Sequence, residues 1–244
     1  MATKPNPRHL SAVTPPPAGT SLDQYPLVPA GPDTDIPVVY RVHDTYNSDG
    51  SLRSPLYYSS AWEPGTAPYT GGRFDLQGSA GLGTCNTGRS PLAAIREYLG
   101  TMSYKTEISL SLLAGKSVSR ICLKRPIVLV DARVDGPGYY ADSVSDARHK
   151  GTNYALTQLW AQGIYELGAD GNISNSSLGE TENVYLYGPA GVYEGDLEAK
   201  ETVDLIEAYR ECLTQGAGLP KIIEDTQSFP GDFGGALHDS LPPI

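Results

Sequence analysis

The sequence predicts an α+β domain, with strands in mixed sheets and flanking helices. Short strand patterns and helix patterns follow one another without strict strand–helix–strand alternation. The 244 residues include 27 glycines and 20 prolines, which imply many turns and long connections. Hydrophobic residues make up 39% of the chain, enough for a sizeable core. We therefore expect one folded domain rather than a disordered chain.

The domain is expected to span residues 36–225, between two tails. Residues 1–35 contain many prolines and little apolar periodicity, which is typical of a flexible Pro-rich tail or tether. Residues 226–244 are rich in glycine and proline and are expected to form an irregular C-terminal tail. The function is therefore sought in the segment between the tails.

The first strand is predicted at 36–43, a β-branched and aromatic run that ends in a polar loop. Because side chains alternate along a strand, Arg41 is expected on the face opposite its two neighbours. Residues 54–70 are rich in Tyr, Ser and Pro and predict a loop that covers a site. A short strand is expected next, at 73–76.

A glycine-rich loop, AGLGTCNTG at 80–88, is expected to lead into a helix. Ser90 and Pro91 are typical of an N-cap and a first helical turn. Apolar residues at helical spacing predict the buried stripe of this helix, namely Leu92, Ile95 and Leu99. Glu97 lies off this stripe, so it is expected on another face of the helix.

The later elements are predicted from the same patterns. Strands are expected at 118–123, 127–130 and 184–187. Helices are expected at 105–113, at 197–213 and over the stretch whose one face carries Leu156, Leu159, Trp160 and Ile164. Loops are expected at 135–151 and 168–183.

Charge and composition exclude several classes of protein. The formal net charge is −10 at pH 7 and the longest basic cluster is Lys124-Arg125, so a nucleic-acid partner is not expected. No apolar run approaches the roughly 18 to 20 residues that cross a bilayer, and the N-terminus lacks the apolar core of a signal peptide. We expect a cytoplasmic protein with no membrane partner, or an effector that is delivered without a signal peptide.

Several cofactor and catalytic motifs are absent from the sequence. It contains no phosphate-binding G-x-x-x-x-G-K-[ST] loop, no G-x-G-x-x-G and no H-E-x-x-H. The four histidines lie far apart, and three cysteines are too few and too widely spaced for a Cys-rich zinc site. No metal is therefore expected.

The remaining candidates for chemistry are charged and polar residues around the glycine-rich stretch. Guanidinium groups fork onto phosphate oxygens, so Arg41 and Arg73 could hold a pyrophosphate. Gly72 lacks a side chain, which lets its backbone N–H approach the same anion. If Glu97 faces a cleft, its carboxylate could stabilise positive charge on a ribose ring. Taken alone, a charged residue of this kind more often has an ordinary surface role than a role in a site.

Four segments resemble the RES domain family, which is named for an Arg, a Glu and a Ser. They are VYRVH at 39–43, GGRFD at 71–75, AAIRE at 93–97, and DGNISNSS at 170–177 leading into NVYLYG. They occur in the family's order. The resemblance implies an ADP-ribosyltransferase-like fold and cleavage of NAD at the nicotinamide–ribose bond.

The resemblance also assigns the motif residues. Arg41 would be the family Arg, Arg73 its second arginine and Glu97 the family Glu. Ser176 would be the family Ser, with Ser174 and Ser177 as alternative alignments. In this assignment the two arginines bind phosphates, Glu97 acts at the ribose, and the serine orients a phosphate or ribose oxygen.

One feature of the family is missing from the sequence. Family members usually carry a tyrosine in the strand before A-x-x-E, but the matching segment at 80–88 contains no aromatic residue. If that tyrosine stacks on nicotinamide, another aromatic must replace it. The candidates are Tyr57, Tyr58 and Tyr69.

The resemblance implies a NAD-degrading toxin, either an NAD phosphorylase or an NAD glycohydrolase. NAD would then be the substrate, phosphate a co-substrate, and an antitoxin or immunity protein the partner; an oligomer is compatible with the sequence. Two alternatives remain open. One is a protein ADP-ribosyltransferase, and the other is a non-catalytic nucleotide- or partner-binding module, which the missing tyrosine favours.

Overall fold

The computed structural model describes residues 13–61, 71–145, 154–176, 178 and 180–224. The strands of its main sheet are β1 (Leu27–Ala30), β2 (Val38–Asp44), β4 (Leu82–Gly88), β6 (Lys116–Leu123), β7 (Ile127–Asp131), β8 (Gly171–Asn175), β9 (Glu182–Pro189) and β11 (Leu197–Asp204). Two small sheets pair β3 (Tyr57–Tyr58) with β10 (Gly191–Val192), and β5 (Glu107–Ser109) with β12 (Lys221–Ile223). The helices are α1 (Pro91–Leu99), α2 (Ala141–Ser145), α3 (Ala155–Glu166) and α4 (Leu205–Thr214).

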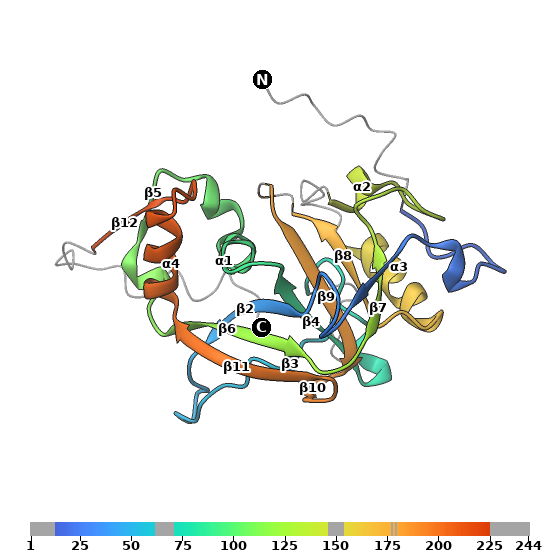
Figure 1. The fold of residues 1–244 in the computed structure, drawn as a ribbon, viewed down its shortest axis with the longest axis horizontal. Helices are drawn as coiled ribbons and strands as arrows, with labels where there is room; N and C mark the ends of the chain where they lie inside the picture. The colour runs from blue at the N-terminus through green and yellow to red at the C-terminus, as the bar shows by residue number, and fades with distance from the viewer. Residues whose placement is uncertain (1–12, 62–70, 146–153, 177, 179, 225–244) are drawn as a thin grey trace, which may run out of the picture.

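The main sheet is mixed, with the strand order β1-β7-β8-β9-β4-β2-β6-β11. Only β7 and β8 run parallel among its neighbouring strands. Figure 1 shows a curved sheet with α1 and α4 over one part and α2 and α3 over the other. The predicted α+β class, a mixed sheet with flanking helices, is confirmed.

Three apolar clusters hold these layers together. One packs Trp160 of α3 against the sheet near Tyr185, and another packs Ile95 of α1 and Tyr209 of α4 over β6. The third lies on the opposite face of the sheet and includes Val39. Such burial is the main favourable term in folding, so both faces of the sheet contribute to its stability.

The N-terminal boundary of the fold lies earlier than the sequence predicts. Residues 13–35 are not a free tail, because β1 pairs antiparallel with β7 at the edge of the sheet. The side chains of Val13, Tyr25 and Ala30 are buried. The local proline content is compatible with this arrangement because an edge strand tolerates proline. Residues 1–12 and the predicted C-terminal tail at 226–244 lie outside the described residues.

The predicted glycine-rich loop is wrong, because most of it forms β4 in the middle of the sheet. Its glycines mark places where other backbone segments approach closely. A Cβ on Gly83 would lie 2.9 Å from the carbonyl oxygen of Tyr58. A Cβ on Gly88 would lie 2.5 Å from the backbone nitrogen of Ala94 in α1.

Three other predicted elements differ from the structure. The helix expected at 105–113 is β5 followed by a short 3-10 turn, and the polar loop expected at 168–183 contains β8. The helix expected at 197–213 is β11 followed by α4. Asp204 explains the last boundary, because its carboxylate accepts the backbone N–H groups of Ile206 and Glu207 and starts the helix there.

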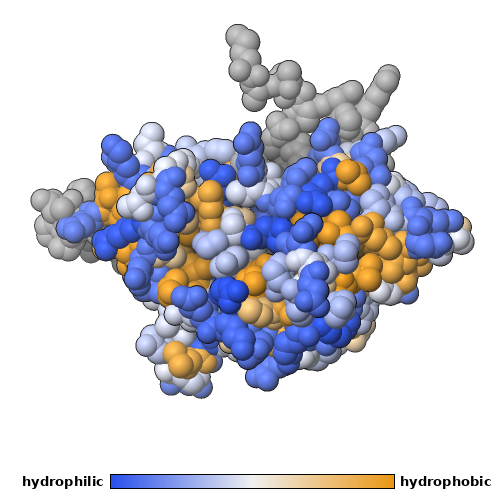
Figure 2. Space-filling view, viewed as in Figure 1, coloured by the Kyte–Doolittle hydropathy of each residue, from blue (hydrophilic) through white to orange (hydrophobic). Residues whose placement is uncertain are grey.

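The remaining predicted elements are present with small shifts in their ends, namely β2, α1, β6, β7, α3 and β9. Within the loop expected at 135–151, α2 forms, and residues 146–151 lie outside the described part. In the described part of the chain, no helix has the length and apolar character to cross a membrane. Figure 2 shows that the viewed face mixes hydrophilic side chains with several separate apolar patches.

Candidate functional site

The site is built on a row of residues that pair across four neighbouring strands. Tyr40 of β2 is opposite Gly88 of β4, Gly88 is opposite Asn183 of β9, and Asn183 is opposite Ser174 of β8. Paired residues in a sheet point to the same face. This face is the one that α1 covers, because Gly88 lies directly beneath that helix.

Helix α1 presents Glu97 to this row. The helix begins where predicted: the Ser90 hydroxyl accepts the backbone N–H of Ala93 at 3.1 Å, and Pro91 occupies the first turn. Ile95 and Leu99 are buried on the apolar side. Glu97 lies off that side, as predicted, and is half-buried toward the sheet.

Asn183 holds the carboxylate of Glu97 in place. Its Nδ2 donates a hydrogen bond to Glu97 Oε2 at 2.6 Å, and Asn183 is completely buried. A short bond from a fixed amide to a carboxylate is charge-assisted and restricts the side chain. Residue 97 is therefore a positioned acid rather than a freely solvated one.

Tyr185, two residues along β9, lies beside Asn183 on the same face. Its ring packs edge-on against Phe74, with centroids 4.5 Å apart. Burial, together with the negative charge of Glu97, raises the pKa of Tyr185, although the positive charge of Arg73 acts in the other direction. The phenol therefore stays protonated at neutral pH and can donate a hydrogen bond.

Arg73 brings a cation to the same cluster. It is only 8% exposed, its Nη1 donates to the carbonyl oxygen of Val144 in α2 at 3.4 Å, and its guanidinium stacks 5.9 Å from the centre of the Tyr154 ring. Its charge also reaches Tyr185. The Arg73 guanidinium lies 5.9 Å from the centre of the Phe74 ring, which packs on Tyr185, and the Tyr185 hydroxyl lies 3.5 Å from Asn183 Nδ2, the donor to Glu97. These contacts bring together Arg73, Tyr185 and Glu97, which are far apart in the sequence.

The GGRFD segment that carries Arg73 is a tight turn, so the strand predicted at 73–76 is wrong. The Asp75 carboxylate accepts the backbone N–H of Gly72 at 2.7 Å and an amide hydrogen of Asn86 at 3.2 Å. Gly71 has a φ of 102°, which favours glycine. The sequence predicts that the backbone N–H of Gly72 faces a phosphate, but in the structure it donates to the Asp75 carboxylate.

Burial raises the pKa of Asp75, while the bonds from Gly72 and Asn86 and the charge of Arg41 oppose that shift. Buried carboxylates of this kind are stable only when hydrogen-bonded. We therefore assign Asp75 to holding the shape of the turn. The shape of the turn determines the backbone position from which the Arg73 side chain extends.

Arg41 lies on the other face of the sheet, opposite its neighbours as predicted. Its Nη1 donates to the carbonyl oxygens of Pro55, at 2.9 Å, and Tyr57, and lies 3.2 Å from the Cys85 sulfur. The guanidinium is near enough to influence Asp75 from beneath. The structure gives Arg41 no described contact with Glu97, and its role as a phosphate ligand stays a prediction.

Of the two candidate serines in the described part of the chain, Ser174 is the one that lies in the row with Asn183. It is fully buried on the row opposite Asn183, and it influences Tyr185. Ser176 starts the next loop, where its hydroxyl accepts the backbone N–H of Leu178 at 3.1 Å. That bond leaves the Ser176 hydroxyl hydrogen available for a ligand. Ser177 lies outside the described residues.

None of the described candidate tyrosines reaches Glu97. Tyr58 is buried on the opposite face, against Tyr193 at 5.7 Å between ring centroids. Tyr57 is 39% exposed, and Tyr69 lies outside the described residues. The aromatic residue at the site is Tyr185, which sequence reasoning missed. The alternation in the NVYLYG segment was the available signal, because it places Asn183 and Tyr185 on one face.

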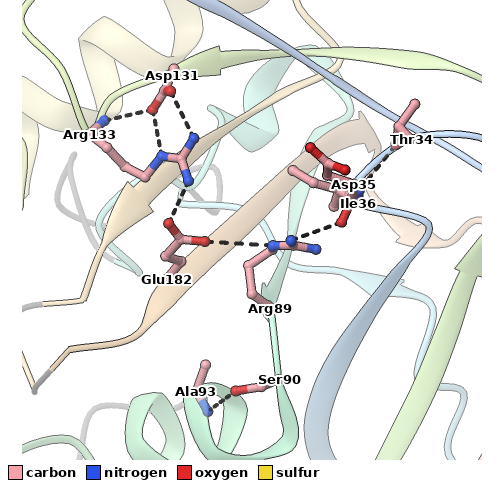
Figure 3. A network of polar contacts seen from close by, with 9 residues as sticks. All are labelled: Thr34, Asp35, Ile36, Arg89, Ser90, Ala93, Asp131, Arg133 and Glu182. Atoms are coloured by element: carbon pink, nitrogen blue, oxygen red, sulfur yellow. Dashed lines mark hydrogen bonds and ion pairs between the residues drawn. The ribbon is translucent and has the colours of Figure 1, made fainter.

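Glu182 precedes Asn183 in β9, so its side chain points to the opposite face of the sheet. There it belongs to a charged network (Figure 3). Glu182 contacts Arg133 and lies 3.6 Å from Arg89 Nε, while Arg133 Nε lies 2.8 Å from Asp131 Oδ1. Arg89 also donates to the carbonyl oxygen of Asp35 at 2.9 Å. This network joins β7, β9 and the end of β4. No group of acidic, His or Cys side chains in the described part is arranged to hold a metal ion.

The curled mixed sheet with its flanking helices is an ADP-ribosyltransferase-like fold. The chain belongs to the RES domain family, whose model matches residues 38–205. Among solved structures, the fold is similar to a chain of the crystal structure of the M. tuberculosis MbcT–MbcA toxin–antitoxin complex. That match has a TM-score of 0.51 and 15% identity, and covers 71% of this chain and 87% of the other. A comparison with curated proteins gave no match.

Proposed function

We propose that this protein degrades NAD by cleaving the bond between nicotinamide and ribose, and that it acts as the toxin of a toxin–antitoxin pair. The observation that carries the proposal is the cluster of Arg73, Tyr185 and the positioned, half-buried Glu97, which is linked through contacts with Phe74 and Asn183. Family membership supports the same reading.

The chemistry asked of these residues is simple. The C1′–nitrogen bond breaks, its electron pair leaves on nicotinamide, and the ribose becomes oxocarbenium-like. Glu97 stabilises that positive charge, and Arg73 binds a phosphate of the substrate. An oxygen of water or of inorganic phosphate then bonds to C1′, and water in this role releases one proton. Ser176 keeps its predicted role at the phosphates. Arg41 keeps that role only if its guanidinium exchanges the carbonyl oxygens of Pro55 and Tyr57 for a phosphate on its own face of the sheet.

An antitoxin or immunity protein is the partner that we propose, with the cytoplasm as the place of action. The similar solved structure is named as a toxin–antitoxin complex, which supports a partner of this kind. An antitoxin that covers the site would keep NAD out until the antitoxin is removed. This part of the proposal is tested separately from the reaction, by co-purification with the product of an adjacent gene.

Nicotinamide release from NAD, followed by liquid chromatography with and without inorganic phosphate, tests the reaction. A phosphate-dependent ADP-ribose phosphate product identifies phosphorolysis, whereas free ADP-ribose identifies hydrolysis. Labelled NAD that marks protein instead would identify a protein ADP-ribosyltransferase. If NAD stays intact over hours, the catalytic proposal fails. Calorimetric binding of NAD in that case would identify a non-catalytic module.

Arg73→Lys is expected to raise the KM for NAD about tenfold, with a smaller change in kcat. Lysine keeps the charge but loses the planar fork that binds phosphate and stacks on Tyr154. Steady-state kinetics of nicotinamide release measure both constants. Arg53→Lys is the matched control, since Arg53 also stacks on a tyrosine, Tyr57, but pairs with Asp44 and has no described contact with Glu97. Equal KM values for the two variants would contradict the role of Arg73.

A further inference from the structure

We propose that Asn183 is the positioning residue for Glu97 in the NAD-cleaving reaction, and this inference rests on the proposed function. The residue is suited to that task by its place in the sheet. It lies in β9, which is paired on both sides, to Gly88 of β4 and to Ser174 of β8. A side chain on such a central strand has a fixed origin, whereas the long side chain of Glu97 has several rotatable bonds.

The orientation of the Asn183 amide follows from its partner. An ionised carboxylate can only accept, so the amide must turn Nδ2 toward Glu97 Oε2. Glu97 Oε1 is then the oxygen that we assign to the substrate ribose.

The opposite end of the Asn183 amide adds nothing to the stability of the fold. Asn183 Oδ1 is buried and has no hydrogen-bond partner among the described residues. A buried oxygen without a hydrogen-bond partner destabilises the folded state. The compensating benefit that we assign is control of Glu97.

A second buried asparagine provides a comparison within the same sheet. Asn172 of β8 is also 0% exposed and lies opposite Tyr185, one row away from Asn183. Its Oδ1 accepts the phenol hydrogen of Tyr187, and it has no described contact with Glu97. The two asparagines therefore share burial, strand context and face, and each has one amide atom without a partner among the described residues, Asn172 Nδ2 and Asn183 Oδ1. They differ in that Asn183 contacts Glu97.

The first test measures the contact without using activity. Asn183→Asp and Asn172→Asp are each made in the wild-type background and in a Glu97→Gln background, and urea midpoints are measured at pH 8. Asn183→Asp places two carboxylates within about 3 Å, so it should lower the midpoint much more in the wild-type background than in the Glu97→Gln background. Asn172→Asp should shift the midpoint equally in both backgrounds. Equal shifts for Asn183→Asp would overturn the inference whether or not NAD is cleaved.

The second test measures the catalytic consequence. In Asn183→Asp the two adjacent carboxyls share a proton, so one of them titrates at a higher pH. The acid limb of the kcat profile for nicotinamide release should therefore move up by about one pH unit or more, with kcat at pH 7 reduced. Arg73 and Tyr185 face the same cluster and are unchanged in both variants. A wild-type profile in Asn183→Asp overturns the positioning role, while a wild-type enzyme that releases no nicotinamide overturns only the proposed function.

Discussion

Replacing Glu97 with glutamine is expected to reduce kcat for nicotinamide release by about 100-fold or more, because the negative charge that stabilises the ribose cation is lost. The fold should survive, since the glutamine carbonyl can still accept the hydrogen bond from Asn183 Nδ2. Binding of NAD should change much less than turnover. Single-turnover kinetics and calorimetry separate the two effects.

Glu182→Gln is the control for this variant. Glu182 precedes Asn183 but points to the opposite face, where it contacts Arg133 and Arg89 (Figure 3). Its loss should lower stability by no more than about 1 kcal/mol, because these ion pairs are partly exposed. Activity should stay within about threefold of wild type. If both glutamine variants lose activity equally, Glu97 has no special role.

Gly88→Ala is expected to disrupt both the fold and the site. The new Cβ would lie 2.5 Å from the backbone nitrogen of Ala94 and 2.8 Å from the Cβ of Ala93, so α1 has to move outward. Overpacking of this kind typically costs about 1–3 kcal/mol. Because α1 carries Glu97, nicotinamide release should also fall by about tenfold or more. Urea unfolding and the release assay measure the two effects.

Gly218→Ala is the matched control for this second variant. A Cβ at Gly218 would meet only the end of the flexible Arg96 side chain, at 4.0 Å. Neither stability nor activity should change measurably. Full activity in Gly88→Ala would show that α1 can position Glu97 without its close contact with β4.

The parts of the fold that the sequence predicts well are those determined by local chemistry. Helix α1 is the example: Ser90 caps it, Pro91 starts it, and its apolar spacing places Glu97 on a different side. Strand β4 is the opposite case. Its glycines are needed because Tyr58 and α1, which lie outside the strand, approach the strand backbone closely. Composition alone therefore predicts a loop for this segment.

The site divides in the same way. Arg73 and Glu97 are found from their motifs, although only the helix around Glu97 is predicted correctly and the turn around Arg73 is not. Asn183 and Tyr185 meet Glu97 only because β9 pairs with β4 at one register. A shift of one residue would turn both to the other face, and nothing in the local sequence reports that register.

Because of the edge strand β1, the folded unit begins earlier in the chain than the part that matches the family model. The family model begins at residue 38, whereas β1 shields the long side of β7 from residue 27 onward. A chain trimmed to the family boundary would leave the apolar strand β7 with an open row of backbone N–H and C=O groups. Such an edge recruits strands from other molecules. The proline-rich segment thus contributes to solubility as well as to packing, although it carries none of the motif residues.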